Sequence, residues 1–153
     1  MSNPIRQLNE YFSDESKWCK GGLAKNFEGK SMFPFNPILR EWTPAEDISS
    51  CCLVGGLILT TKDRDLMISD EGNGKEIIDI LYASLDEKFY ERSYYYNRRR
   101  YALVHFNNDA ETTFPVFKAF LNRAEALWDK QHPEERPTDI SVFTGFSKTK
   151  ELV

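Results

Sequence analysis

The sequence lacks any apolar run long enough to cross a membrane. Its longest, Cys51 to Leu59, falls well short of the ~20 residues that a spanning helix needs. No basic segment followed by an apolar one opens the chain, as a secretion leader would. We therefore expect no membrane association and a cytoplasmic location.

Histidine and cysteine are scarce and poorly spaced for metal binding. The two histidines, His105 and His132, lie far apart, and none of the three cysteines belongs to a Cys-x-x-Cys pattern. Adjacent Cys51 and Cys52 would point about 100° apart on a helix, which makes a shared metal ion difficult. The sequence thus predicts reduced thiols, no metal site and no cofactor.

Positive charge is also in short supply. The chain carries 20 Lys and Arg against 24 Asp and Glu, a formal net charge of −4. Nucleic-acid binding is driven mainly by basic side chains that neutralise phosphates, so a general nucleic-acid binder is disfavoured. Because an acidic protein suits a basic partner surface, we expect the partner to be another protein or a second copy of the chain.

Apolar and aromatic residues, by contrast, are plentiful. Hydrophobic residues make up 41% of the 153 residues and aromatics 14%, enough to build one core. We predict a single globular domain over residues 1–131, of the α+β class and helix-dominated, with three to four helices packed on a small β-sheet or hairpin. Pro133 and Pro137 cannot continue a helix, so residues 132–153 are expected to form an extension that packs on the domain or on a partner.

In the first half of the chain, helix caps and turn residues predict where the secondary-structure elements begin and end. Asn3-Pro4 precedes apolar residues at helical spacing, so a short helix is expected up to about Ser13, followed by a hairpin or extended loop over 18–37. Thr43-Pro44-Ala45-Glu46 is typical of a helix start. Within that helix, Gly55-Gly56 marks either close packing of another element or an early end.

The second half alternates between helical and extended patterns. Its expected elements are a loop over 61–74, a helix over 75–90, a strand over 101–106 and a final helix that begins at Thr113.

One combination of residues contains the parts of a nucleophilic site. A catalytic cysteine needs a base in hydrogen-bonding reach and a third group that orients this base, and Cys19, His105 and Asp109 or Asn108 supply these types. However, nucleophilic cysteines commonly lie at a helix N-terminus, whereas Cys19 is expected to follow a helix. No catalytic residue is therefore favoured, and a small cysteine-dependent hydrolase or transferase is kept as an alternative.

Residues 94–101 are the only basic stretch interleaved with aromatics. Arg98, Arg99 and Arg100 can neutralise phosphates while the neighbouring tyrosines stack on bases, as in proteins that bind single strands. Three consecutive arginines cannot all lie on one face of a strand, so pairing with the abundant carboxylates is the favoured interpretation. Nucleic-acid binding here is a second alternative.

Several short motifs occur in a characteristic order. Trp18-Cys19-Lys20-Gly21-Gly22-Leu23-Ala24 is followed by Cys51-Cys52-Leu53-Val54-Gly55-Gly56-Leu57, then by Phe106-Asn107-Asn108-Asp109 and Thr113. This order resembles an uncharacterised family of small bacterial and phage proteins, classed as a domain of unknown function. Its pattern is Trp-(Cys/Thr)-x-Gly-x-x-Ala, Trp-Cys-x-x-Gly-Ala and aromatic-Asn-Asp. The resemblance covers about Leu8 to Trp128, with Cys51 in place of Trp and Gly56 in place of Ala.

The resemblance brings no activity with it. Because the family accepts Thr at the position of Cys19, it argues against a nucleophile there, whereas Asn108 and Asp109 carry over. An Asn-Asp turn can bind its own backbone and the start of the next helix, or line a ligand pocket together with Trp18. The candidate binding residues are therefore Trp18, Asn108, Asp109, Arg98, Arg99 and Arg100.

Small size, acidity, surplus aromatics and the lack of an intact catalytic motif favour a non-catalytic binding or interaction protein. We hypothesise an accessory or inhibitor from a phage or mobile element, such as an anti-defence protein.

Overall fold

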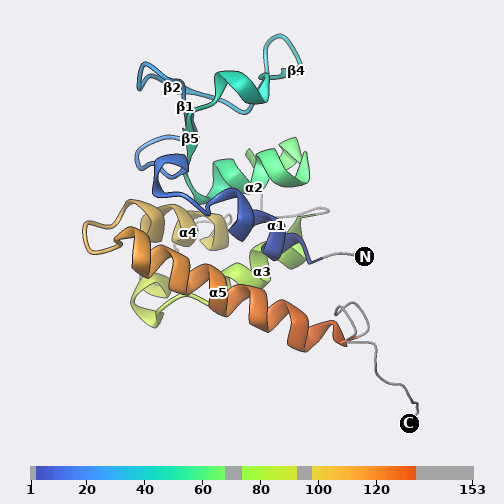
Figure 1. Cartoon of the computed structure of the whole chain (residues 1–153). Helices are drawn as coiled ribbons and strands as arrows, with labels where there is room; N and C mark the ends of the chain where they lie inside the picture. Colours follow the sequence, from blue (N-terminus) through green and yellow to red (C-terminus); the bar gives the residue numbers. More distant parts are fainter. Residues whose placement is uncertain (1–2, 68–73, 93–97, 134–153) are drawn as a thin grey trace.

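The computed structural model describes residues 3–67, 74–92 and 98–133. In these ranges, five α-helices form a body and five short strands form a smaller β-rich lobe beside it (Figure 1). The helix-dominated α+β class predicted from the sequence is confirmed. None of the described helices combines the length and apolar character needed to traverse a bilayer. Apart from its first two residues, the predicted extension over 132–153 lies outside the described residues.

The predicted opening helix is present as α1 (Pro4–Tyr11). Asn3 caps it, because its Oδ1 accepts hydrogen bonds from the backbone N of Ile5 at 2.8 Å and of Arg6 at 3.2 Å. Pro4 occupies the first turn, where its missing N–H costs no hydrogen bond. Ile5 and Leu8 are fully buried, so the helix is anchored on its apolar side.

Two small antiparallel arrangements make up the β-rich lobe. Strands β1 (Ala24–Lys25), β2 (Ser31–Met32) and β5 (Ser50–Cys51) form a sheet in the order β2-β1-β5. Strands β3 (Phe35–Asn36) and β4 (Glu41–Trp42) form a separate hairpin. The hairpin expected within residues 18–37 is thus observed as β1–β2.

The prediction that a helix begins at Thr43 is wrong. Thr43 instead forms hydrogen bonds across the β3–β4 hairpin. Its backbone N donates to the Pro34 carbonyl and its Oγ1 donates to the Phe33 carbonyl, both at 2.8 Å. It is therefore unable to cap a helix, and only a single 3-10 turn, Ala45–Asp47, follows. The helix α2 begins ten residues later, at Leu53–Thr61, behind Cys52.

Helix α2 is the central element, with every residue from Leu53 to Leu59 buried. Gly55 and Gly56 mark close packing of other elements against α2, and not an early end of the helix. A Cβ on Gly55 would lie 1.7 Å from the Leu23 carbonyl oxygen, and one on Gly56 would lie 2.5 Å from the ring of Phe12. Any larger residue at position 55 would collide with backbone, which cannot rotate out of the way.

The prediction of a strand over 101–106 is also wrong, because these residues belong to helix α4 (Arg98–Asn108). A short apolar run suits a buried helix as well as a strand. As a helix, it buries Ala102, Leu103 and Phe106 and leaves Tyr101 and His105 exposed. The two remaining helices were predicted: α3 (Lys75–Ala83), which ends earlier than expected, and α5 (Phe114–Gln131).

Helices α1 and α5 are joined by polar contacts as well as by apolar packing. Arg6 forms ion pairs with Glu125 at 3.0 Å and with Asp129 at 3.1 Å. The side-chain amide of Asn3 donates to the Asp129 carboxylate at 3.0 Å and that of Asn9 to the Glu125 carboxylate at 3.0 Å. The first helix is therefore fixed by the last one (Figure 1).

Candidate functional site

Asn107, at the end of α4, is the buried polar centre of the molecule, with a side chain only 1% exposed. Its Oδ1 accepts hydrogen bonds from Trp18 Nε1 at 2.7 Å and from the backbone N of Leu53 at 3.0 Å. Its Nδ2 donates to the Cys19 carbonyl at 3.0 Å and to Asn108 Oδ1 at 3.1 Å. Both lone pairs and both N–H groups of this amide are thus used.

The residues around Asn107 complete the same junction. Asn108 Oδ1 accepts from the backbone N of Gly21 at 3.0 Å, and Lys20 Nζ donates to the Asp109 carbonyl at 2.7 Å. The Trp18 ring stacks on Phe117 with centroids 4.7 Å apart. The three motifs that are separate in the sequence therefore meet, and we call this meeting point the Asn107 junction.

The sequence motifs pointed to Asn108 and Asp109, whereas the central residue is Asn107. An Asn that directly follows buried Phe106 in an apolar segment was the available signal, because a buried amide must find partners. With 101–106 expected as a strand, Asn107 appeared to belong to a surface turn. Asp109 does form such a turn, since its Oδ1 accepts from the backbone N of Glu111 at 2.9 Å.

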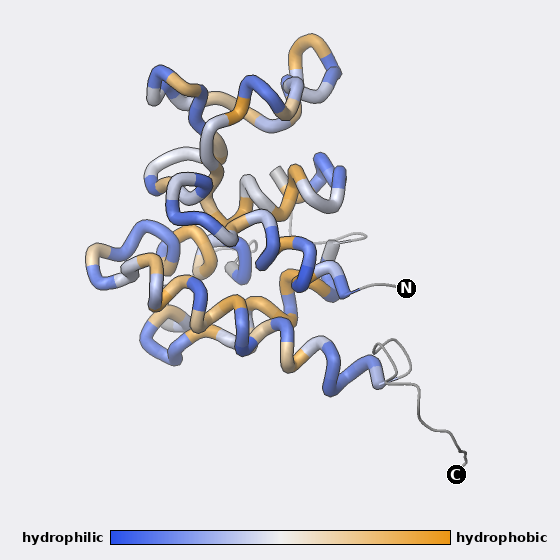
Figure 2. Tube along the Cα trace, viewed as in Figure 1, coloured by the Kyte–Doolittle hydropathy of each residue, from blue (hydrophilic) through white to orange (hydrophobic). Residues whose placement is uncertain are grey.

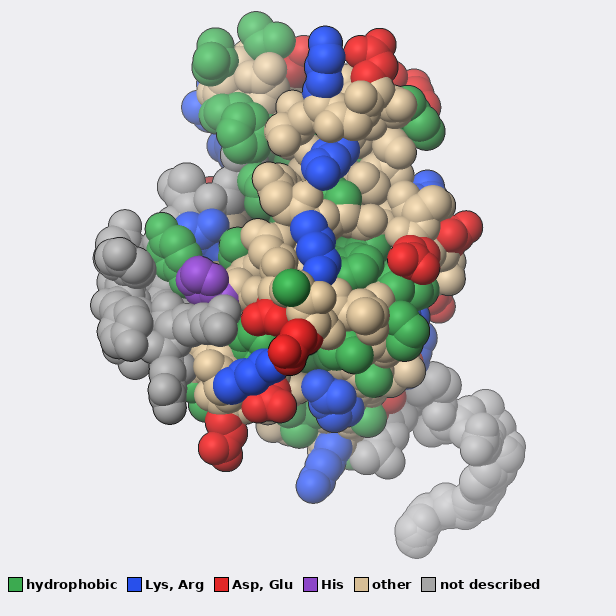
Figure 3. Space-filling model, turned by 90° about the vertical axis from the view of Figure 1, so that its left-hand side faces the viewer, with side chains coloured by type: hydrophobic (Ala, Val, Ile, Leu, Met, Phe, Trp, Pro, Cys, Tyr) green, Lys and Arg blue, Asp and Glu red, His purple; other side chains and the backbone are tan. Residues whose placement is uncertain are grey.

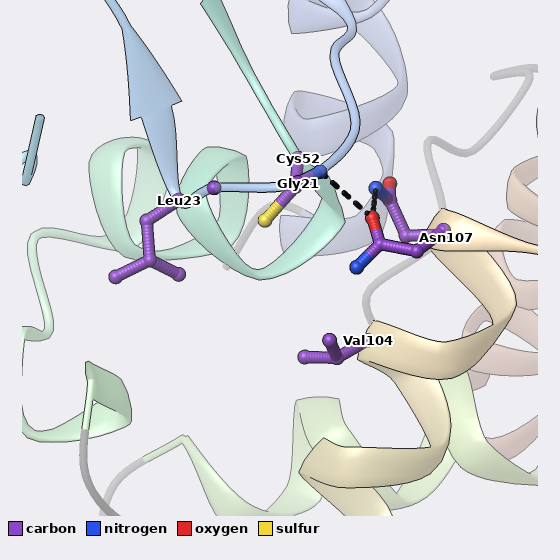
Figure 4. Close-up of a pocket in the computed structure, with 7 residues that line it drawn as sticks. Gly21, Leu23, Cys52, Val104 and Asn107 are labelled. Atoms are coloured by element: carbon purple, nitrogen blue, oxygen red, sulfur yellow. Dashed lines mark hydrogen bonds between the residues drawn. The ribbon is translucent and has the colours of Figure 1, made fainter. Parts of the chain in front are cut away.

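A cavity of about 260 Å³ lies beside the Asn107 junction. Figure 4 shows Leu23, Cys52 and Val104 facing one common space, with Gly21 and Asn107 along its edge. Gly22 and Asn108 complete the lining. Trp18 does not line this cavity, because its ring is packed against Phe117.

The structure separates the parts of the hypothetical cysteine site. Asn107 contacts the carbonyl of Cys19, whereas His105 lies two residues earlier on α4, about 200° around the helix axis, and is exposed. His105 thus lies on a different side of α4 from Asn107. In the described ranges, no hydrogen bond joins His105 to Cys19 or to Asp109.

Cys51 and Cys52 are buried thiols that contribute to packing. Burial raises the pKa of Cys51 to about 12 and that of Cys52 to about 11. Tyr11 donates its hydroxyl to Cys51 Sγ at 3.4 Å, and burial raises the pKa of Tyr11 as well. Cys52 Sγ accepts from the backbone N of Gly55 at 3.3 Å and so caps α2. Within the part of the chain described, no group of His, Cys, Asp or Glu is placed to hold a metal ion.

These raised pKa values predict that the protein loses stability in alkaline solution. The native state keeps both thiols protonated above pH 9.0, their ordinary pKa, where the unfolded chain releases these protons. The free energy of unfolding should therefore be constant below pH 8 and fall between about pH 9 and 12. Each thiol contributes a fall of up to about 1.4 kcal/mol per pH unit. Urea unfolding at pH 8, 9 and 10 measures this. Cys51→Val should show a shallower fall, and an equally steep one would contradict the assignment.

The arginines of the basic stretch are partly engaged inside the protein. Arg99 forms an ion pair with Asp79 at 3.0 Å and lies 5.9 Å from the centre of the Tyr82 ring. The Arg100 guanidinium lies 5.9 Å from the centre of the Tyr101 ring. Residues 93–97 and the side chain of Arg98 lie outside the described part. On the face shown in Figure 3, the described Lys and Arg side chains stand apart or next to acidic ones and form no continuous basic surface.

The tip of the β3–β4 hairpin exposes two large apolar side chains. Ile38 is 88% exposed and Leu39 is 64% exposed. Asn36 fixes the tip, because its Oδ1 accepts from the backbone N of Ile38 at 2.9 Å and of Leu39 at 3.0 Å, and its carbonyl accepts from Arg40 N at 2.8 Å. We call residues 37–40 the hairpin tip; it projects from the β-rich lobe and has hydrophobic colouring in Figure 2.

The base of this hairpin is attached to the helical body. Phe35 and Trp42 pack edge to face with centroids 5.2 Å apart. The Arg64 guanidinium lies 4.9 Å from the centre of the Phe35 ring, and Lys62 Nζ lies 4.9 Å from the centre of the Trp42 ring. The hairpin tip therefore stands on a fixed base.

Comparison with known proteins adds no relative. No protein-family model matches the chain, and no match was found among curated proteins or solved structures. The family resemblance drawn from the short motifs stays a prediction.

Proposed function

We propose that this chain is a non-catalytic interaction protein that binds a protein partner through its hairpin tip. The observation that carries the proposal is the exposure of Ile38 and Leu39 on a turn that hydrogen bonds hold in one conformation. Burying one such side chain in a partner contributes roughly 1.5–3 kcal/mol. Because the turn is already ordered, little conformational entropy is lost on binding.

The chemistry of the tip defines the kind of partner. Ile38 and Leu39 need an apolar pocket, and a pair of neighbouring large side chains is typical of the few residues that dominate a protein interface. Exposed Phe27 and Phe33 lie on the same β-rich lobe, and Figure 3 shows apolar side chains gathered on one corner of it. The net charge of −4 favours a partner whose apolar pocket is surrounded by basic residues, because opposite charges raise the association rate at low salt.

The biological role we propose is that of a cytoplasmic accessory or inhibitor, as in a phage or mobile element. A small acidic protein that inserts an ordered apolar hairpin tip into a site on its partner can block that site without catalysing a reaction. The separation of His105 from Cys19 supports this choice over a cysteine-dependent enzyme.

Site-specific photo-crosslinking tests the proposal. A benzophenone amino acid at position 38 should give one discrete protein adduct in cells, while the same group at exposed Ala126 on α5 should not. An adduct of twice the chain mass would identify a second copy as the partner. Absence of any adduct from position 38, or the same adducts from both positions, would contradict the proposal.

A paired substitution supplies the matched control. Ile38→Ser with Leu39→Ser should remove the partner adduct from a probe at Phe33, yet change the free energy of unfolding by no more than about 0.5 kcal/mol, because both side chains are exposed.

A further inference from the structure

We propose a second and independent binding site: the cavity beside the Asn107 junction takes a small, neutral ring compound that carries a hydrogen-bond acceptor. This site shares no residue with the hairpin tip. It lies between the Gly21–Leu23 segment and the last turn of α4 (Figure 4).

The lining determines the charge and polarity of the ligand. None of the residues around the cavity carries a charge, so an ionised ligand would lose water without gaining a partner. Leu23 and Val104 offer apolar walls, and the buried thiol of Cys52 forms part of the inner surface. A neutral and mostly apolar molecule is the class that such a lining accepts.

One polar group gives the ligand its orientation. The Oδ1 of Asn108 is fully engaged, since it accepts from Gly21 N at 3.0 Å and from Asn107 Nδ2 at 3.1 Å. These two bonds fix the plane of the amide, and within the described residues its Nδ2 has no hydrogen-bond partner. This amide therefore presents a donor at the rim of the cavity, where it can meet a carbonyl oxygen or a ring nitrogen.

The junction also makes the site rigid before any ligand arrives. Asn107 ties the floor to Trp18 and Leu53, so the walls contributed by three chain segments are held in one arrangement. In volume, about 260 Å³ exceeds the roughly 150 Å³ that holds a benzene molecule in a dry protein cavity. There is thus room for a six-membered ring with a short substituent.

Binding of three matched probes tests this inference. Acetophenone is neutral with an acceptor, ethylbenzene lacks the acceptor, and benzoate has similar size but is charged. In a ¹H–¹⁵N correlation spectrum, acetophenone should shift the amides of Gly21 and Gly22 and the side-chain amide of Asn108, with a dissociation constant on the order of 1 mM. Ethylbenzene should bind about fivefold more weakly, the effect of one neutral hydrogen bond, and benzoate should cause no saturable shift there.

Two substitutions decide whether the cavity is the site. Val104→Phe fills it from a half-exposed position and should abolish the acetophenone shifts, whereas Val116→Phe, the same change at an exposed position on α5, should leave them intact. Asn108→Asp keeps an Oδ1 acceptor for Gly21 but removes the donor, so acetophenone should bind it about fivefold more weakly.

The inference is overturned if acetophenone shifts none of these three amides up to its solubility limit, if benzoate binds equally well, or if the shifts persist in Val104→Phe. Should Val104→Phe lose its native spectrum, Asn108→Asp and the probe series still decide the question. These outcomes do not depend on the hairpin tip, so failure here leaves the crosslinking experiment unaffected.

Discussion

Replacing Asn107 by alanine is expected to lower the free energy of unfolding by about 4 kcal/mol or more. The change leaves Trp18 Nε1, the backbone N of Leu53 and the Cys19 carbonyl without their partner at a position that is 1% exposed. Each buried polar group that loses its hydrogen bond costs about 1–3 kcal/mol. Urea unfolding followed by Trp fluorescence measures the effect, since Trp18 is one of the partners.

The adjacent amide provides the control for this prediction. Asn108→Ala removes the acceptor for Gly21 N and Asn107 Nδ2 but acts at an exposed side chain, so a loss of about 1 kcal/mol is expected. Equal losses for the two variants would show that the Asn107 junction does not hold the motifs together.

Gly55→Ala is expected to be the most damaging single-methyl change in the molecule. Its Cβ would lie 1.7 Å from the Leu23 carbonyl oxygen, and this carbonyl accepts a hydrogen bond from the backbone N of Cys52 at 3.1 Å. Relief requires that α2 and the start of β1 move apart, which breaks that bond and opens the core. We expect a loss of at least about 3 kcal/mol, in the range of severe core overpacking, or failure to fold, by circular dichroism and thermal unfolding.

Gly56→Ala adds the same methyl group one residue later. There the contact is the ring of Phe12 at 2.5 Å, and a side chain can shift where backbone cannot. A smaller loss than for Gly55→Ala is therefore expected, and the reverse order would refute the packing argument.

Local signals predicted the elements that depend on local chemistry. Asn3 and Thr113 are caps in the structure, with Thr113 Oγ1 accepting from Val116 N at 3.5 Å, and the apolar face of α5 is buried at Phe117, Leu121, Ala124 and Trp128. These helices carry their own start signals and a clear apolar face, so tertiary contacts did not overrule them.

The errors arose where a distant partner decides the outcome. Thr43 has the residue type of a cap, but Pro34 and Phe33 engage it across the hairpin. The run Tyr101–Phe106 has no decisive period, and packing selects the helix. Asn107 was missed as the centre of the junction for the same reason, because its partners Trp18, Cys19 and Leu53 reach it only after folding.

The seam between α1 and α5 has a consequence for how the protein is made. The side chain of Asn3 donates to the Asp129 carboxylate and that of Arg6 pairs with Glu125 and Asp129, partners more than a hundred positions further along the chain. Helix α1 also packs on α2, so during translation only its contacts with α5 must wait until Glu125 and Asp129 have left the ribosome. The polar contacts that hold the opening helix to α5 are therefore among the last to form, after the chain between the two helices has been made.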